Sequence, residues 1–95
     1  MMLTNGTTLH LRGVYGRVSY YLSDNELHEG GPYGRICYYI DGNYILEGGK
    51  FGRVAYYISG REILEGGIHG RVAFYIDGSY LLDGGPFGSI AYYIS

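Results

Sequence analysis

Apolar and polar residues alternate along most of the chain in short runs, and glycine-rich segments separate these runs. In the stretch Arg35–Glu47, the runs Arg-Ile-Cys-Tyr-Tyr-Ile and Asn-Tyr-Ile-Leu-Glu flank the pair Asp41-Gly42. β-Branched and aromatic residues favour strands, whereas glycine destabilises the interior of a helix. The pattern therefore predicts an all-β chain of short strands joined by tight turns.

The same pattern recurs every 18 residues without insertions or deletions. Its clearest markers are the pairs Gly16-Arg17, Gly34-Arg35, Gly52-Arg53, Gly70-Arg71 and Gly88-Ser89. Self-similarity at a fixed period is typical of repeat architectures. We therefore expect residues 1–95 to form a single domain of five β-hairpin repeats.

Asp41-Gly42 is expected to be the centre of a two-residue type I′ turn, because that turn needs positive φ at both central positions. The equivalent pairs are Asn5-Gly6, Ser23-Asp24, Ser59-Gly60 and Asp77-Gly78. Such a turn fixes the register of the hairpin. It predicts the pairs Ile40–Asn43, Tyr39–Tyr44, Tyr38–Ile45, Cys37–Leu46 and Ile36–Glu47.

Each hairpin then has two unlike faces. The first face holds Ile36, Tyr38, Ile40 and Ile45, and because its apolar character recurs in every unit we assign it to the core. The second face holds Arg35, Cys37, Tyr39, Tyr44 and Leu46. The position of Tyr44 is glutamate in two other units, so we expect this face to be at least partly in contact with water.

The two ends of the chain carry the two halves of one hairpin. Residues 7–11 are a second strand without a first, and residues 89–94 are a first strand without a second. Pairing them closes a pseudo-five-fold ring and removes the exposed sheet edges. An open stack of hairpins is the alternative, and it would need polar terminal units. The hairpin pattern fits radial petals, as in a flower or propeller, and a small up-and-down barrel equally well.

The segment Gly52–Ile58, Gly-Arg-Val-Ala-Tyr-Tyr-Ile, resembles the hairpin repeats of bacterial β-flower proteins. The resemblance spans nearly the whole chain and implies a pseudo-symmetric ring, usually four-fold, without implying a particular activity. This chain departs from it in having five units. A looser similarity is to aromatic hairpin repeats that bind choline, but those use tryptophan, which this chain lacks.

Composition narrows the classes of function. A chain of 95 residues cannot enclose the core of a large enzyme. Its net charge of −2, without a basic cluster, argues against nucleic-acid binding. The longest apolar runs, such as Ile36–Ile40, have five residues and are too short to cross a membrane as a helix. The start of the chain lacks a signal-peptide pattern, which favours the cytoplasm. Cys37 is the only cysteine, so no internal disulfide is expected.

No catalytic motif is present, and we expect neither an enzyme nor a cofactor. His10 and His28 occupy equivalent positions and His69 does not, so we expect solvated histidines and no metal site. The recurring acids allow either a glycosidase or ion pairs between repeats. We favour ion pairs, because equivalent positions would give the two catalytic carboxyls the same pKa. These acids are Glu29, Glu47, Glu65 and Asp83.

Recurring arginines and tyrosines on the second face form the candidate ligand-binding set. Arginine offers paired donors to anions, and tyrosine offers a flat surface with a hydroxyl. The set is Arg17, Arg35, Arg53, Arg71, Tyr21, Tyr39, Tyr57, Tyr75 and Tyr93. Stacking of these tyrosines beneath the arginines would explain the same residues without a ligand.

The sequence thus favours a binding or assembly module that uses Tyr- and Arg-rich repeat surfaces. The alternative is a lectin-like module with repeated saccharide sites between hairpins. The candidate partners are a small anion, a saccharide, another protein or a second copy of the chain, and they include neither nucleic acid nor a membrane.

Overall fold

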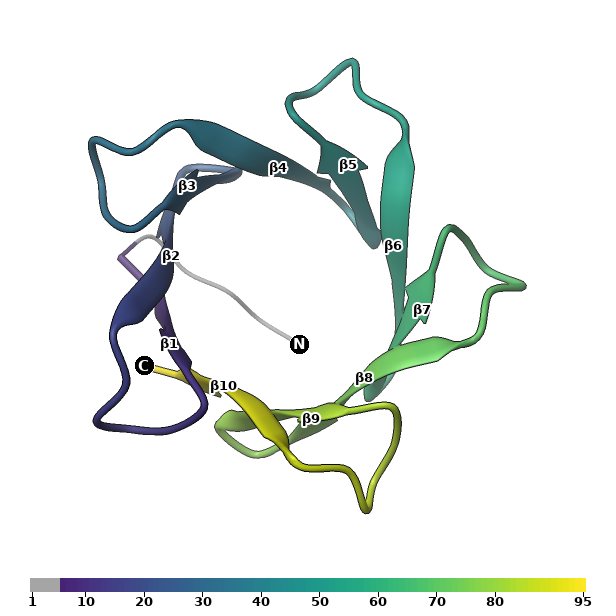
Figure 1. Ribbon diagram of the computed structural model, residues 1–95. Coiled ribbons are helices and arrows are strands. Elements are labelled where there is room, and N and C mark those ends of the chain that lie inside the picture. Colours follow the sequence, from purple (N-terminus) through teal and green to yellow (C-terminus); the bar gives the residue numbers. More distant parts are fainter. Residues whose placement is uncertain (1–5) are drawn as a thin grey trace.

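The computed structural model describes residues 6–95, which form ten antiparallel strands and no helix, hence none long and apolar enough to cross a membrane. The strands are β1 (Thr8–Leu11), β2 (Val18–Ser23), β3 (Glu26–Glu29), β4 (Ile36–Asp41), β5 (Tyr44–Glu47), β6 (Val54–Ser59), β7 (Glu62–Glu65), β8 (Val72–Asp77), β9 (Tyr80–Asp83) and β10 (Ile90–Ile94). Each strand pairs with its neighbours in the chain, and the sheet closes into a flat barrel measuring 33 × 32 × 17 Å. Five loops project outward from the ring like petals (Figure 1).

The ring closes through its two terminal strands, as the complementary half-hairpins predict. Strand β1 pairs with β10 in the register Leu9 to Ile94 and His10 to Tyr93. Thr8 and Ser95 exchange both backbone hydrogen bonds, at 3.2 and 2.9 Å. The prediction of a closed ring is therefore confirmed and the open stack is wrong, and residues 6–95 leave no sheet edge unpaired.

The hairpin turns lie one residue later than the sequence predicted. Asp41 pairs with Tyr44, so the central residues are Gly42, with φ of 63°, and Asn43, which has no positive φ. Glycine at the first position alone is typical of a type II′ turn, not type I′. Tyr39 therefore faces Leu46 rather than Tyr44. Moving the turn by one residue changes each cross-strand partner by two residues, so the turn itself leaves every residue on its predicted face. Asn5, from the predicted turn Asn5-Gly6, lies outside the described residues.

A β-bulge where successive hairpins meet moves one predicted core residue outward. Leu27 pairs with Tyr38 but the next residue, His28, pairs with Ile36, which leaves Cys37 unpaired between them. Ile36 therefore turns to the outer face and is 38% exposed, and the prediction that it lies in the core is wrong. The same register shift occurs at all five junctions between hairpins.

The core lies in two layers. Inside the ring, Ile45, Ile58, Ile63 and Leu81 form the buried aliphatic cluster. The outer face also contains buried leucines: Leu46, Leu64 and Leu82. Each lies between a tyrosine of its own hairpin and an apolar residue of the next junction, as Leu46 lies between Tyr39 and Val54. On the second face, these leucines are therefore less exposed to solvent than the residues at the neighbouring position, which are Glu26, Tyr44 and Glu62.

Candidate functional site

Five aromatic side chains form a closed ring inside the barrel. They are Tyr20, Tyr38, Tyr56, Phe74 and Tyr92, one from each long strand. Neighbouring ring centroids lie 6.0–6.2 Å apart and neighbouring planes meet at about 60°. Tilted, edge-to-face contacts of this kind are favourable between aromatic rings. The period of 18 residues thus places one aromatic group at each corner of a pentagon.

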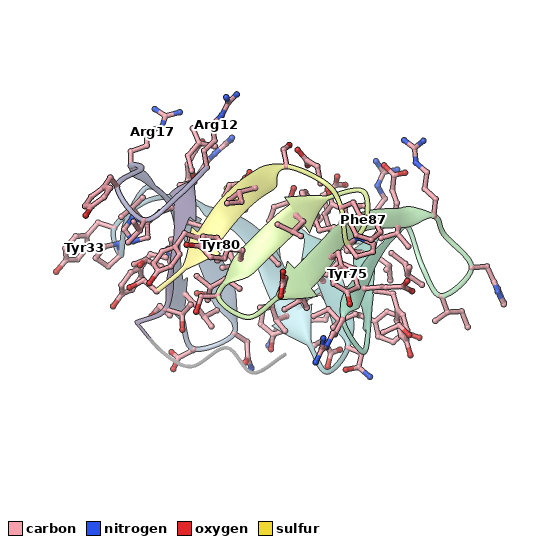
Figure 2. All side chains as sticks on the ribbon, turned by 90° about the horizontal axis from the view of Figure 1, so that it is seen from below. Arg12, Arg17, Tyr33, Tyr75, Tyr80 and Phe87 are labelled. Atoms are coloured by element: carbon pink, nitrogen blue, oxygen red, sulfur yellow. The ribbon has the colours of Figure 1, made fainter. Side chains whose placement is uncertain are left out.

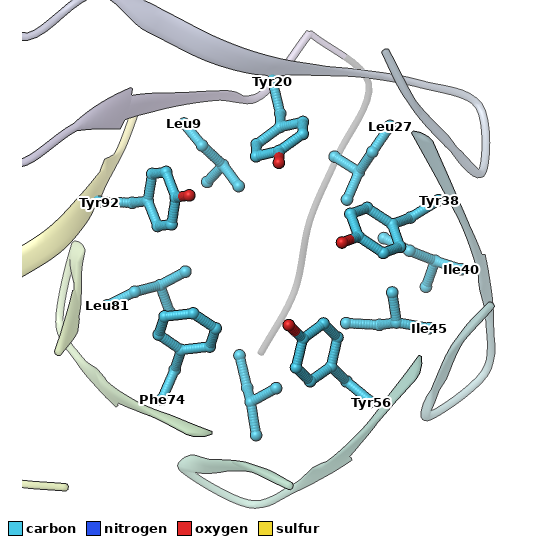
Figure 3. A pocket seen from close by; sticks show the side chains of 11 residues that line it. Leu9, Tyr20, Leu27, Tyr38, Ile40, Ile45, Tyr56, Phe74, Leu81 and Tyr92 are labelled. Atoms are coloured by element: carbon cyan, nitrogen blue, oxygen red, sulfur yellow. The ribbon is translucent and has the colours of Figure 1, made fainter. Parts of the chain in front are cut away.

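The tyrosine hydroxyls of this aromatic ring point toward its middle (Figure 3). Burial, and next the nearby phenol groups of Tyr92 and Tyr38, raise the pKa of Tyr20 from 10.0 to about 12. Burial also raises the pKa of Tyr38 and that of Tyr56. These phenols are therefore neutral at ordinary pH and offer hydroxyl groups that can both donate and accept hydrogen bonds. Phe74 leaves one side of the ring without a hydroxyl.

A cavity of about 140 Å³ lies within the aromatic ring. Its other walls are aliphatic: Leu9, Leu27, Ile40, Ile45, Ile63 and Leu81. An apolar cavity of about 150 Å³ can hold a molecule the size of benzene. The interior therefore combines an apolar volume of that size with a belt of phenol hydroxyls.

Charged residues surround one end of the barrel, at the bases of the outward loops. Arg35, Arg53 and Arg71 each donate from Nε to the carboxylate six residues earlier, at 2.8–2.9 Å. These pairs link successive hairpins, as the ion-pair interpretation predicts. Both partners of each pair are well exposed, so solvent weakens the attraction and each pair contributes little to the stability of the fold.

Shallow clefts at this rim join the charged residues to the aromatic ring. One cleft of about 290 Å³ is lined by Arg17, Tyr20 and Tyr92, among others. Another, of about 380 Å³, includes Arg12, Phe74 and Tyr92. Arg12 and Arg17 project from the same end of the ring (Figure 2). The clefts therefore share aromatic side chains with the cavity: Tyr20, Phe74 and Tyr92.

The tyrosines of the candidate set lie on the outside of the barrel, apart from this cavity. The rings of Tyr57 and Tyr44 meet edge-on with their centroids 5.1 Å apart, and the ring centroids of Tyr93 and Tyr80 lie 5.4 Å apart. Tyr21, Tyr39 and Tyr75 take the equivalent outward positions. Among the described residues, no hydrogen bond or cation–π contact joins these five tyrosines to Arg17, Arg35, Arg53 or Arg71. The arginines instead share clefts with the inner aromatics.

Sequence reasoning placed the inner aromatics in the core and gave them no role as a binding site. A signal was present, because the position of Tyr38 is aromatic in every unit. Phe74 is the only one of the five that is not tyrosine. Arg12 was not singled out either. Its signal is that it replaces a glycine found in the other four repeats.

His10, His28 and Cys37 lie within hydrogen-bonding distance of backbone carbonyl groups. Nδ1 of His10 lies 2.9 Å from the Gly16 carbonyl oxygen, and Nδ1 of His28 lies 2.8 Å from that of Gly34. Each imidazole thus fastens a loop to the strand before it. Sγ of Cys37 lies 3.9 Å from the carbonyl oxygen of Arg35. Within residues 6–95, no three metal-ligating side chains come together.

Comparisons of the chain with models of known protein families, with curated proteins and with solved structures found no match.

Proposed function

We propose that this protein is a non-enzymatic binding module that takes a small apolar or amphipathic molecule into the mouth of its ring. The observation that carries the proposal is the cavity of about 140 Å³ inside a closed pentagon of aromatic side chains. Ligand sites are commonly concave and apolar, with a few polar groups that orient the ligand. Here the phenol hydroxyls of Tyr20, Tyr38, Tyr56 and Tyr92 are those polar groups.

Toluene tests the proposal, because it has the size of the cavity and no charge. A ligand that binds only the folded state raises the melting temperature, and the rise grows with the logarithm of the ligand concentration relative to Kd. We expect toluene to raise the melting temperature and to shift the NMR signals of residues that line the cavity, such as Leu9 and Ile45.

Adjacent leucines provide a matched pair of variants. Leu81 lines the cavity, whereas Leu82 lies on the outer face, and both are buried. Leu81→Phe should fill the cavity and abolish the effect of toluene, and Leu82→Phe should leave it unchanged. Absence of any toluene effect on the unmodified protein would remove the proposal, as would equal losses in the two variants.

The outer surface supports a second candidate, a contact surface for a saccharide or another protein. The loop tips carry Tyr15, Tyr33, Phe51 and Phe87, each at least 93% exposed. Exposed aromatic side chains give large contact areas at low entropic cost. Replacing Tyr33 and Phe51 with serine should abolish binding to a glycan array if this surface is used. An array without signal for the unmodified protein would argue against the saccharide.

A further inference from the structure

One of the five loops departs from the repeat. The other four begin with an acidic residue followed by glycine: Glu29-Gly30, Glu47-Gly48, Glu65-Gly66 and Asp83-Gly84. The loop between β1 and β2 begins with Leu11-Arg12 instead. A carboxylate is lost at this place and a cation is gained, so the rim is most positive here.

Arg12 occupies its position at a conformational cost. Its φ is 68°, and the equivalent glycines have φ of 78–82°. Side chains other than glycine rarely adopt this left-handed region, and such strain is concentrated at functional sites. Replacement of a suitable glycine by a strained arginine is thus a second observation that points to a role for the guanidinium.

Arg12 and Arg17 form a pair of cations without an acidic partner. No carboxylate of residues 6–95 lies within ion-pair distance of either, whereas Arg35, Arg53 and Arg71 are paired. The backbone holds the two arginines together, because Leu11 N–H donates to the Arg17 carbonyl at 2.9 Å. Arg12 N–H donates to the carbonyl of Ala91, beside Tyr92.

The acidic residues nearest this loop do not neutralise the positive charge of Arg12 and Arg17. Glu29 lines the cleft of Arg17 but is already bound to Arg35 at 2.9 Å. Asp83 lines the cleft of Arg12, where its carboxylate accepts a long hydrogen bond of 3.5 Å from the Ser89 hydroxyl. Near the two arginines, Asp83 is therefore the only carboxylate of residues 6–95 lining either cleft that is not in an ion pair.

We propose that Arg12 and Arg17 bind the carboxylate of a small amphipathic acid whose apolar part, about the size of a benzene ring, occupies the cavity. This inference rests on the proposed function and specifies its ligand class. The clefts of the two arginines share Leu11 and Tyr92, so one anion at the rim can lie close to both guanidinium groups. Arginine donates paired hydrogen bonds to carboxylates with a geometry that few other groups match.

Phenylacetate and phenylacetamide are suitable probes, because they have nearly the same shape and differ in charge. We expect NMR titration to show that phenylacetate binds about threefold to tenfold more tightly, as for a partly exposed charge-assisted contact. Restoring the repeat pattern with Leu11→Glu and Arg12→Gly should abolish this preference. Because it also relieves the strain at Arg12, this double variant should be at least as thermally stable as the unmodified protein.

A double variant that removes two positive charges elsewhere controls for net charge. Arg61 lies in a turn at the other end of β6 and β7, and Lys50 lies over the Phe51 ring at a loop tip. Arg61→Gln with Lys50→Gln should retain the preference for phenylacetate. Asp83→Asn should increase it, because a negative charge leaves the cleft of Arg12.

The outcomes separate the two proposals. Binding of both probes with equal affinity would overturn the anion site and leave the cavity function intact. A preference that survives Leu11→Glu with Arg12→Gly would overturn the assignment to this loop. If neither probe binds and toluene fails as well, the cavity function itself is overturned, and the anion site with it.

Discussion

Each loop brings one glycine against the carbonyl oxygen of the residue five positions earlier. A Cβ atom on Gly52 would lie 1.7 Å from the backbone oxygen of Glu47, whereas a Cβ on Gly49 would meet nothing within 4 Å. Neither glycine has a φ between +20° and +160°, the range that favours glycine, so the expected difference between them is steric.

Gly52→Ala should therefore lower the free energy of unfolding by about 1–3 kcal/mol, the usual cost of forcing a backbone shift. Gly49→Ala should change it by less than about 0.5 kcal/mol, as for other surface substitutions. Chemical denaturation of both variants measures the difference. Equal stability of the two would contradict the close approach of Gly52 to Glu47.

Tyr20 links the interior of the ring to pH. Its pKa is raised from 10.0 to about 12, so the folded state favours the neutral phenol. The unfolded chain ionises first as the pH rises, and the stability from this group is complete below pH 10 and is lost between pH 10 and 12.

Tyr20→Phe should reduce the loss of stability over that pH range, because phenylalanine cannot ionise. Tyr33→Phe serves as the control, since Tyr33 is fully exposed and makes no contribution to the interior. Denaturation at a series of alkaline pH values tests this prediction. The same pH dependence for Tyr20→Phe and the unmodified protein would contradict the raised pKa of Tyr20 in the folded state.

At the scale of the elements, burial should outweigh charge pairing. Ile63 is 4% exposed and packs in the inner cluster, so Ile63→Ala should cost about 2–5 kcal/mol of unfolding free energy. Arg53→Gln removes one exposed ion pair with Glu47 and should cost about 1 kcal/mol at most. Thermal or chemical denaturation ranks the two variants, and the reverse order would contradict the assignment of the core.

The strands and their faces were predictable because alternation and the count of half-hairpins are local properties of the chain. The turn register was not, because Asp41-Gly42-Asn43 allows glycine at either central position. The exposure of Ile36 was missed because the bulge depends on contacts between hairpins rather than within one.

At the scale of the whole molecule, closure makes positions 8 and 95 neighbours. Thr8→Cys with Ser95→Cys, in a Cys37→Ala background, should form an intramolecular disulfide, because a paired antiparallel position meets the required Cα separation. Closing nearly the whole chain could raise the unfolding free energy by up to about 4 kcal/mol. Mass spectrometry under non-reducing conditions and denaturation test the two expectations.

Thr8→Cys with Ser59→Cys is the matched control, since β6 lies across the ring from β1 (Figure 1). This pair should stay reduced or link two molecules. The same result for the pair at positions 8 and 95 would show that the ends do not meet in solution.

The candidate site was the least predictable feature. In sequence, Tyr38 and its equivalents read as core, and the space between them depends on how many strands close the barrel. A pentagon of rings 6.0–6.2 Å apart leaves a cavity at its centre, which neither composition nor spacing reveals. The loss of an acid at Leu11 and of a glycine at Arg12 was visible, but it gains meaning only beside Tyr92 and the clefts.

A crystal structure of the protein grown with phenylacetate tests the central claim, that the closed ring encloses a binding cavity. We expect density for the phenyl group among Tyr20, Tyr38, Tyr56, Phe74 and Tyr92, with the carboxylate directed to Arg12 and Arg17. A cavity filled by its own side chains, or phenylacetate bound only on the outer face, would contradict the account.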